Sequence, residues 1–185
     1  TRRFDAEATA LQRKGELGLW PPSLGQEAAQ VGSAKAIVER DQIVPSYREH
    51  GVAWVRGVDM VGLLNVFRGS GMIDYDSRAS RFHLYSWVIG AHLLTATGMG
   101  MALQRDGLVG GEDPDQNAAV ITYFGDGATS QGDVNEAFVF ASSFGAPVVF
   151  FCQNNQWAIS VPIALQSRIP LYKRAAGFGF PGIRV

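Results

Sequence analysis

The sequence predicts an α/β fold in which a parallel sheet is flanked by helices. Residues 118–124 and 148–152 are continuous apolar runs with the length of buried strands. Residues 133–144 between them have helical character, and Ala146-Pro147 ends that helix. A strand, a helix and a second strand in this order predict a parallel βαβ unit with a right-handed crossover. Strands as apolar as these are expected to be covered on both faces.

Further helices are expected before this unit. The residue pattern predicts one helix over residues 4–14 and another over residues 59–67. Ser23-Leu24-Gly25-Gln26 has the form of a capping box, so we expect a helix there that runs to about residue 39. Residues 68–86 are polar and irregular, and we expect them to form a long surface loop.

Two helices carry information about packing. The helix expected over residues 90–104 is rich in glycine and alanine, and we prefer tight packing inside one domain to a subunit contact as the reason. The helix over residues 133–144 is apolar nearly all round, with Val139 and Phe140 on the side away from its main apolar face. That main face consists of Val134, Ala137, Phe138 and Ala141. One face is expected to cover the sheet and the other to meet another subunit.

Length and composition exclude several classes of protein. The 185 residues suffice for one ordinary domain, and we expect a single domain over residues 1–185. With 46% hydrophobic and 18% charged residues, the chain is expected to fold rather than stay disordered. The net charge of −1 gives no general attraction to nucleic acid or to an anionic membrane. The longest strongly apolar stretch, residues 146–152, is too short to span a bilayer.

The cysteine content and the chain ends give two further expectations. The single cysteine, Cys152, excludes a disulfide within the chain and fits a reducing compartment, so we expect a cytoplasmic protein. Because Cys152 lies in an apolar strand, we expect an inert core residue. The chain begins at Thr1 rather than methionine and stops at Val185, so we expect that C-terminal residues of the full protein are missing.

Polar motifs follow both predicted strands at the point where each strand ends. Gly125-Asp126-Gly127 follows the first strand, and Asn154-Asn155 follows the second. The carboxyl ends of neighbouring parallel strands lie side by side at the edge where α/β proteins bind ligands, so Asp126 and Asn155 can converge. Carboxylate and amide oxygens suit Mg²⁺, and N–H groups near a helix start suit phosphate. Each motif alone is also a common turn. Together they predict a site for a metal and a diphosphate.

Gly125-Asp126-Gly127, followed after 26 residues by Asn154-Asn155, resembles the thiamine-diphosphate motif. The longer sequences around both motifs are similar to those of the α subunit of the E1 component of 2-oxoacid dehydrogenase complexes of the bacterial α2β2 type. The resemblance extends over essentially the whole chain, including Leu24-Gly25-Gln26-Glu27-Ala28 and Tyr47-Arg48-Glu49-His50-Gly51. It implies the thiamine-diphosphate-binding fold, in a domain that holds the diphosphate and Mg²⁺.

The resemblance also implies roles at the motif itself. The side chains of Asp126 and Asn155 and the backbone carbonyl of Trp157 would bind Mg²⁺. The backbone of Gly127 and Ala128 would bind the diphosphate.

Four residues outside the motif receive roles from the same resemblance. Tyr47 and Arg48 would bind diphosphate oxygens, as a hydroxyl and a forked cation can. From the residues alone we would prefer a packed aromatic and a surface ion pair between Arg48 and Glu49. Trp87 and Ile89 match the segment whose backbone contacts the aminopyrimidine ring of the cofactor.

His92 is the candidate for a catalytic role. By resemblance it lies near the segment that contacts the cofactor, where it would line the site. A packed histidine at a helix start explains the same residue as well.

The implied activity needs partners. With a β subunit in an α2β2 heterotetramer, the chain would carry out thiamine-diphosphate-dependent oxidative decarboxylation of a 2-oxo acid and pass the acyl group to the lipoyl group of the E2 acyltransferase. The glutamate that faces the aminopyrimidine belongs to the β subunit, so the chain alone is expected to be inactive. By the same resemblance, Leu19-Trp20-Pro21-Pro22 falls where family members line the substrate entrance, and its bulk there favours pyruvate over branched-chain acids.

Three alternatives to this function are considered from the residues present. An acetoin dehydrogenase α subunit would carry the same motif. A non-catalytic scaffold of the same fold would have lost site residues, and Tyr47, Arg48, Asp126 and Asn155 are all present. A Mg²⁺–nucleotide-binding domain would need a phosphate loop such as Gly-x-x-x-x-Gly-Lys-Ser/Thr, which the sequence lacks.

Overall fold

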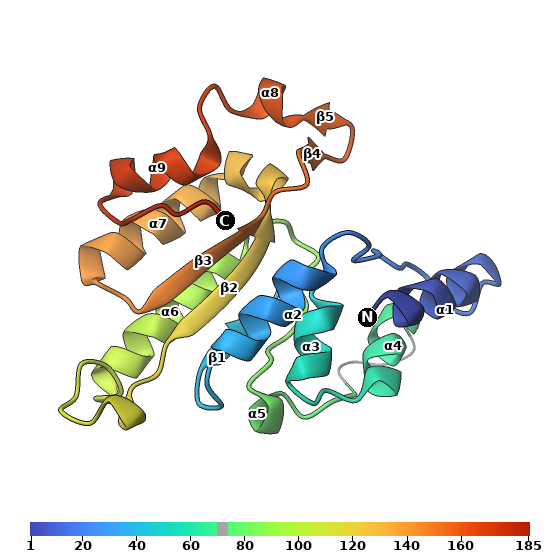
Figure 1. Cartoon of the computed structure of the whole chain (residues 1–185), viewed down its shortest axis with the longest axis horizontal. Coiled ribbons are helices and arrows are strands. Elements are labelled where there is room, and N and C mark those ends of the chain that lie inside the picture. The colour runs from blue at the N-terminus through green and yellow to red at the C-terminus, as the bar shows by residue number, and fades with distance from the viewer. Residues whose placement is uncertain (70–73) are drawn as a thin grey trace. The chain divides into compact units, whose positions relative to one another are not determined.

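The computed structural model describes residues 1–69 and 74–185 (Figure 1). Contacts along the chain group into two compact units, a first unit from Thr1 to Tyr85 and a second unit from Ser86 to Val185. Each unit is described by itself below. The expectation of a single domain over the whole chain stays a prediction. No helix in the described part of the chain has both the length and the apolar character needed to cross a membrane.

The first unit is mostly helical. Its elements are α1 (Arg2–Arg13), α2 (Glu27–Ala36), β1 (Gln42–Val44), α3 (His50–Val55), α4 (Met60–Arg68) and α5 (Ser77–Ser80). The helices predicted over residues 4–14 and 59–67 are therefore confirmed as α1 and α4. Asp59 caps α4 by accepting hydrogen bonds from the N–H groups of Val61 and Gly62. The core is aromatic, with Trp20 stacked on His50 at a centroid distance of 4.2 Å and Phe67 edge-on to both rings.

The capping-box prediction at Ser23 is wrong. The N–H and the hydroxyl of Ser23 both donate to Oδ2 of Asp5, at 2.9 Å each, so the side chain caps no helix. Gly25 adopts a left-handed conformation with φ +87°, and α2 begins only at Glu27. The helix ends at Ala36, before residue 39, because Ile37 is extended.

The surface loop predicted over residues 68–86 is wrong in its second half. Asp76 caps the short helix α5, and Phe82 is fully buried. Phe82 forms a parallel bridge with Ile43 of β1, which places this segment in the core of the first unit. Residues 70–73 of the predicted loop lie outside the described residues.

The second unit contains the predicted strand–helix–strand unit. Its elements are α6 (His92–Arg105), η1 (Pro114–Gln116), β2 (Val120–Gly125), η2 (Asp126–Ser130), α7 (Gly132–Phe144), β3 (Val148–Gln153), β4 (Trp157–Ala158), β5 (Val161–Pro162), α8 (Ile163–Gln166) and α9 (Leu171–Phe178). β2 and β3 are parallel, as predicted, with Val120 opposite Val148 and Gly125 opposite Gln153. In Figure 1 these two strands run side by side with α6 and α7 alongside.

The core of the second unit lies on one face of this strand pair. Leu93 of α6 and Phe138 of α7 pack with Phe124 of β2, and Phe150 and Cys152 of β3 lie against the same cluster. The expectation of cover on both faces holds for the buried β2 but is wrong for β3, whose Val149 is 52% exposed. The reason is that α6 and α7 both pack on the face of the strand pair that carries Phe150 and Cys152, and Val149 points to the other face. Burial raises the pKa of the Cys152 thiol to about 12, and the residue is partly buried against this cluster, so its inertness stays a prediction.

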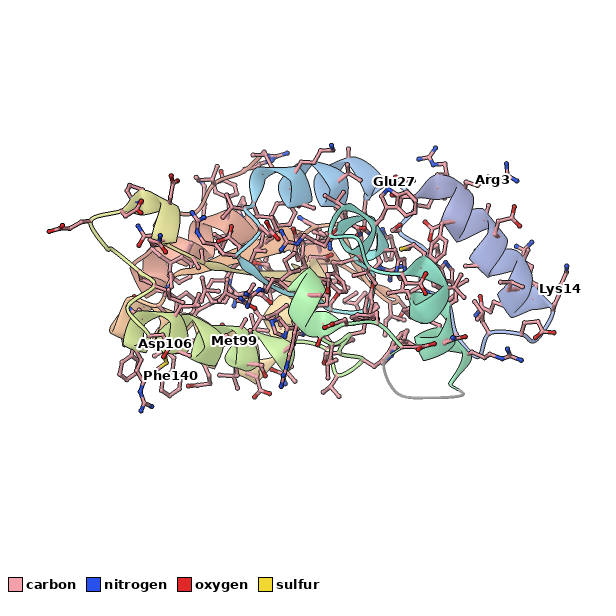
Figure 2. All side chains as sticks on the ribbon, turned by 90° about the horizontal axis from the view of Figure 1, so that it is seen from below. Arg3, Lys14, Glu27, Met99, Asp106 and Phe140 are labelled. Carbon is pink, nitrogen blue, oxygen red and sulfur yellow. The ribbon has the colours of Figure 1, made fainter. Side chains whose placement is uncertain are left out.

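At one position, Gly100, a small residue of α6 is needed for close packing within the second unit. A Cβ on Gly100 would lie 2.8 Å from Cγ2 of Val148, so only glycine lets α6 approach β3 this closely. Gly98 on the outer side of α6 meets nothing within 4 Å. The outer face of α7 likewise stays uncovered, because Val139 and Phe140 are 46% and 45% exposed, and Phe140 reaches the surface (Figure 2). Its expected contact with another subunit stays a prediction.

Candidate functional site

Two polar segments follow the parallel strands and begin at the same level. Gly125, the last residue of β2, lies opposite Gln153, the last residue of β3. Asp126 therefore begins η2 beside the point where Asn154 and Asn155 leave β3. The prediction that the two strand ends lie next to each other is confirmed. The prediction that Asp126 and Asn155 share one metal ion stays a prediction.

A close approach joins the two segments. A Cβ on Gly127 would lie 2.7 Å from the Cβ of Ala158, which is too close for any residue other than glycine. Ala158 belongs to β4, and the residue before it is Trp157. The turn that carries Asp126 thus packs directly on the strand that carries Trp157.

Asp126 is a buried carboxylate with an unsatisfied oxygen. The residue is 1% exposed, and Oδ1 has no hydrogen-bond partner among the described residues. Oδ2 accepts only a long bond, 3.4 Å, from Nε2 of Gln166. Leaving a charged acceptor buried without a partner costs several kcal/mol, so such an oxygen is expected to meet a cation or a donor in the working protein.

Asn155 is held by its own backbone turn. Its Oδ1 accepts a hydrogen bond of 3.0 Å from the N–H of Trp157, and Oδ1 of Asn154 accepts one of 2.9 Å from the N–H of Gln156. Gln156 between them has φ +70°. An amide oxygen has two lone pairs, so Asn155 Oδ1 keeps one for a further partner.

The donor set available here is mixed. Within the described ranges, no group of three or more histidine, cysteine, aspartate or glutamate side chains is placed to hold a metal. The set that the resemblance implies consists of the carboxylate of Asp126, the amide oxygen of Asn155 and the backbone carbonyl of Trp157. Such a set of hard oxygens, completed by phosphate and water, is what Mg²⁺ uses in proteins, so the residues present fit this metal.

The turn of η2 is fixed from both ends. Oγ1 of Thr129 donates to the carbonyl of Asp126 at 2.7 Å. The side chain of Gln131 caps α7 by accepting from the N–H of Asp133. Arg174 of α9 donates to the carbonyl of Thr129 at 3.1 Å and to Oδ1 of Asn135 at 2.8 Å.

Gly127 and Ala128 are the first residues after Asp126 in η2, where N–H groups have no acceptor within the helix.

Gln166 and Arg174 were missed by the sequence analysis. Neither residue belongs to a motif, and their partners Asp126 and Thr129 lie 40 and 45 residues away in the chain. No local pattern contains the signal for such long-range contacts.

The segment before α6 lies against the start of α7. Gly90 has φ +85°, and a Cβ there would lie 2.9 Å from Cγ2 of Val134. Trp87 and Ile89 just before it are each 41% exposed. Their predicted contact with an aminopyrimidine ring stays a prediction.

His92 is packed at the start of α6. The residue is 5% exposed, and Nε2 lies 2.7 Å from the carbonyl of Tyr123, so Nε2 carries the proton. Burial lowers the pKa of the imidazole, although the hydrogen bond to Tyr123 opposes this shift. Nδ1 is buried and has no partner in the described part of the chain. These contacts give His92 a packing role, and its catalytic role stays a prediction.

Tyr47 and Arg48 belong to the first unit. The Arg48 guanidinium lies 5.4 Å from the centre of the Tyr47 ring and donates to the carbonyl of Pro22. The carboxylate of Glu49 is fully buried and accepts from the N–H of Arg48 and from the N–H and hydroxyl of Ser46. Glu49 thus organises the backbone that presents Tyr47 and Arg48. Their predicted bonds to a diphosphate stay a prediction.

Comparison with known proteins identifies the family. The model of the family described as "Dehydrogenase E1 component" matches residues 1–185. The chain belongs to the dehydrogenase E1 component family. This confirms the family expected from Gly125-Asp126-Gly127 and Asn154-Asn155.

Relatives of this E1 component chain carry two kinds of name. The 3-methyl-2-oxobutanoate dehydrogenase subunit alpha of Mycobacterium tuberculosis is 43% identical over 188 residues, covering 100% of this chain and 48% of the relative. The pyruvate dehydrogenase E1 component subunit alpha of Staphylococcus aureus is 35% identical over 186 residues, with the same coverage of 100% and 48%. The chain thus spans about half the length of these relatives.

Solved structures show the fold of the E1 component chain. Transketolase from Leishmania mexicana matches 96% of this chain and 30% of its own with a TM-score of 0.66 and 17% identity. A putative thiamin diphosphate-dependent enzyme from Mycobacterium smegmatis matches 87% of this chain and 28% of its own with a TM-score of 0.53 and 18% identity. At these identities the likeness concerns the fold, and it confirms the predicted parallel α/β fold of thiamine-diphosphate enzymes.

Proposed function

We propose that the chain acts as the α subunit of the E1 component of a 2-oxoacid dehydrogenase complex. With a β subunit it would carry out the oxidative decarboxylation of a 2-oxo acid and transfer the acyl group to the lipoyl group of an E2 component. Family membership and the names of the relatives support the reaction class. The observation that carries the proposal is the unpartnered Oδ1 of the buried Asp126 at the end of β2.

The residues around Asp126 would hold the diphosphate end of the cofactor. Asp126, Asn155 and the carbonyl of Trp157 would bind Mg²⁺, and the N–H groups of Gly127 and Ala128 would bind the diphosphate. The packing of Gly127 on Ala158 supports this set, because it keeps the aspartate turn against the strand that carries Trp157. When bound, thiamine diphosphate supplies the electron sink for the loss of CO₂.

Residues farther from the metal would orient the rest of the cofactor. Tyr47 and Arg48 would add donors to the diphosphate oxygens. The backbone of Ile89 and Trp87 would contact the aminopyrimidine, held in place by the contact of Gly90 with α7. His92 would fix the start of α6 on β2 through its bond to Tyr123.

A β subunit is the proposed partner, in an α2β2 assembly. The outer face of α7 leaves Val139, Phe140 and Phe144 between 45% and 53% exposed, and a face this apolar suits a protein partner. We therefore expect the chain without a β subunit to show no 2-oxoacid decarboxylation, because the partner completes the site. Full turnover by the purified chain alone would contradict this expectation.

Neighbouring asparagines give the sharpest test of the cofactor site. Asn155→Ala and Asp126→Ala are expected to abolish Mg²⁺-dependent binding of thiamine diphosphate, measured by calorimetry on the assembled enzyme. Asn154→Ala is the matched control, because Asn154 makes the same kind of turn with the N–H two residues ahead. Its affinity is expected to change less than about tenfold, as for loss of one hydrogen bond. Equal effects of both asparagine substitutions, or unchanged affinity in Asp126→Ala, would place the site elsewhere.

The preferred acid is proposed to be branched. The preference for pyruvate depended on the bulk of Leu19-Trp20-Pro21-Pro22, and the largest of these side chains, Trp20, is 3% exposed and stacks on His50 inside the first unit. The greater identity to the 3-methyl-2-oxobutanoate enzyme, 43% against 35%, supports a branched 2-oxo acid. We expect the assembled enzyme to have a higher kcat/KM for 3-methyl-2-oxobutanoate than for pyruvate, by about 10- to 100-fold. Faster use of pyruvate would restore the first preference, and acetoin turnover would replace both.

A further inference from the structure

The side chain of Gln166 connects the Asp126 turn with the β4–β5 hairpin. Gln166 is the last residue of α8, and Nε2 lies 3.4 Å from Oδ2 of Asp126 and 3.1 Å from the carbonyl oxygen of Val161. Both partners are acceptors, so the amide nitrogen must face them and the amide oxygen must point the other way. The orientation of this side chain is therefore fixed by its surroundings.

Two buried oxygens remain without a donor at this place. Oδ1 of Asp126 and Oε1 of Gln166 are both inaccessible to solvent and lack hydrogen-bond partners among the described residues. Two acceptors cannot satisfy each other, so both need a cation or a donor from beyond the described residues. The residues that carry them are already joined through Nε2 and Oδ2.

We propose that Gln166 is a positioning residue for the metal ligand Asp126. By donating to Oδ2, the amide would leave Oδ1 available to the cation, and its bond to Val161 ties the carboxylate to the hairpin that begins at Trp157. The free Oε1 then accepts from a donor that arrives with the cation, since Mg²⁺ usually keeps several waters. This inference rests on the proposed function, because it needs Mg²⁺ at Asp126.

The position of α8 supports a fixed geometry rather than a chance contact. The N–H of Ile163 donates to the carbonyl of Gln156 at 2.9 Å, and the N–H of Ser167 donates to the carbonyl of Ile163 at 3.0 Å. Gln166 is therefore anchored to the same segment that follows Asn155. One side chain thus holds the two halves of the proposed donor set, one after β2 and the other after β3, in a single arrangement.

Gln166→Met tests the inference with Gln104→Met as the matched control. Gln104 also bridges two acceptors, the carbonyls of Phe144 and Gly145, but at the far end of α7. Mg²⁺ and Ca²⁺ are titrated separately into the assembled enzyme with thiamine diphosphate, followed by calorimetry. Removing the amide is expected to weaken Mg²⁺ binding by about 10- to 100-fold, as for other residues that orient metal ligands. Ca²⁺ accepts irregular geometry, so its affinity is expected to fall by less than about threefold.

A loss of the preference for Mg²⁺ over Ca²⁺ is the result that a merely structural role of Gln166 would not produce. If Gln166→Met weakens both cations equally, or weakens neither, the inference is overturned. Gln166→Asn keeps an amide but is one methylene shorter, and it is expected to lose Mg²⁺ affinity in the same direction, which keeps the test valid should the methionine variant fail to fold. Asp126→Asn is measured beside them. If that variant retains Mg²⁺ affinity, the proposed function itself fails, whereas its loss together with an unchanged Gln166→Met rejects the inference alone.

Discussion

The two units differ in how they satisfy their buried polar side chains. In the first unit, Asp5 accepts from Nε1 of Trp20 at 3.1 Å and from the N–H and hydroxyl of Ser23 at 2.9 Å. Glu49 likewise accepts donors from Ser46 and Arg48. Both ring nitrogens of His50 have partners, the carbonyl of Pro21 at 2.9 Å and the hydroxyl of Tyr85 at 3.1 Å.

The second unit leaves buried polar atoms without partners. Among the described residues, four buried side-chain atoms lack a hydrogen bond: Nδ1 of His92, Oγ1 of Thr122, Oδ1 of Asp126 and Oε1 of Gln166. All four belong to residues of the second unit. Only Asp126 and Gln166 are bonded to each other.

The difference teaches how to separate structural from functional buried charges. A buried carboxylate that accepts three hydrogen bonds from its own chain stabilises the fold, so its loss lowers the free energy of unfolding. A buried carboxylate with a free oxygen weakens the fold until a ligand arrives. Replacing Asp5 by asparagine is therefore expected to lower mainly the free energy of unfolding. The same replacement at Asp126 is expected to remove mainly the binding of ligand.

The largest effect is expected at Asp5. Asp5→Asn keeps the shape but replaces one carboxylate oxygen by an NH₂ group, which then faces either the indole N–H of Trp20 or the donors of Ser23, so the free energy of unfolding should fall by about 4 kcal/mol. Urea unfolding of the natural polypeptide that contains these residues, in buffer without divalent cations, measures this loss. Asp106→Asn, at the exposed end of α6, is the control and should change stability by less than about 0.5 kcal/mol. A loss at Asp5 no larger than at Asp106 would break the comparison.

The next effect concerns His50 and acid. Burial lowers the pKa of this imidazole to about 4, while an unfolded histidine titrates near 6.5. Between pH 6.5 and 4 the unfolded chain binds a proton that the folded chain excludes, so stability is lost as pH falls through this window and does not change further below it. The loss should be about 3 kcal/mol, and above pH 6.5 His50 contributes no pH dependence.

His50→Gln isolates this contribution. Burial lowers the pKa of His83 and His92 as well, so their contributions have the same sign and remain in the variant. Urea unfolding at a series of pH values should therefore show a shallower acid slope for His50→Gln than for the natural sequence. Parallel slopes would mean that burial does not keep the imidazole of His50 neutral in the folded chain.

A third effect tests the close approach in the second unit. Gly127→Ala puts a methyl group 2.7 Å from the Cβ of Ala158, where neither side can turn away. Overpacking of this kind should lower the free energy of unfolding by about 2 kcal/mol. Gly98→Ala is the matched control, because a Cβ there meets nothing within 4 Å, and it should raise stability by about 0.5–1 kcal/mol. Thermal unfolding of both variants measures the pair, and equal shifts would show that Gly127 is not confined.

The sequence predicts local features well and long-range polar pairs poorly. The βαβ unit follows from apolar runs and from the break at Ala146-Pro147, and strand parallelism then brings the strand ends Gly125 and Gln153, which precede the two polar motifs, next to each other. The capping box failed because Ser23 bonds to Asp5, 18 residues away, and no local pattern contains that competitor. The contact of Gln166 with Asp126 could not be predicted for the same reason, since the two residues are 40 positions apart in the chain.

The smallest change in stability is expected at Asp126, and it completes the comparison with Asp5. Asp126→Asn removes a charge whose Oδ1 has no partner, so the desolvation cost that it relieves offsets the weak bond from Gln166 that it disturbs. In buffer without divalent cations, urea unfolding should show a change below about 1 kcal/mol. With Mg²⁺ and thiamine diphosphate present, the natural sequence should gain stability by about 2.7 kcal/mol at a ligand concentration 100 times its Kd, and Asp126→Asn should gain none. A cation-free loss as large as that of Asp5→Asn would mean that Asp126 already has its partners within the fold, and the site would lose its main support.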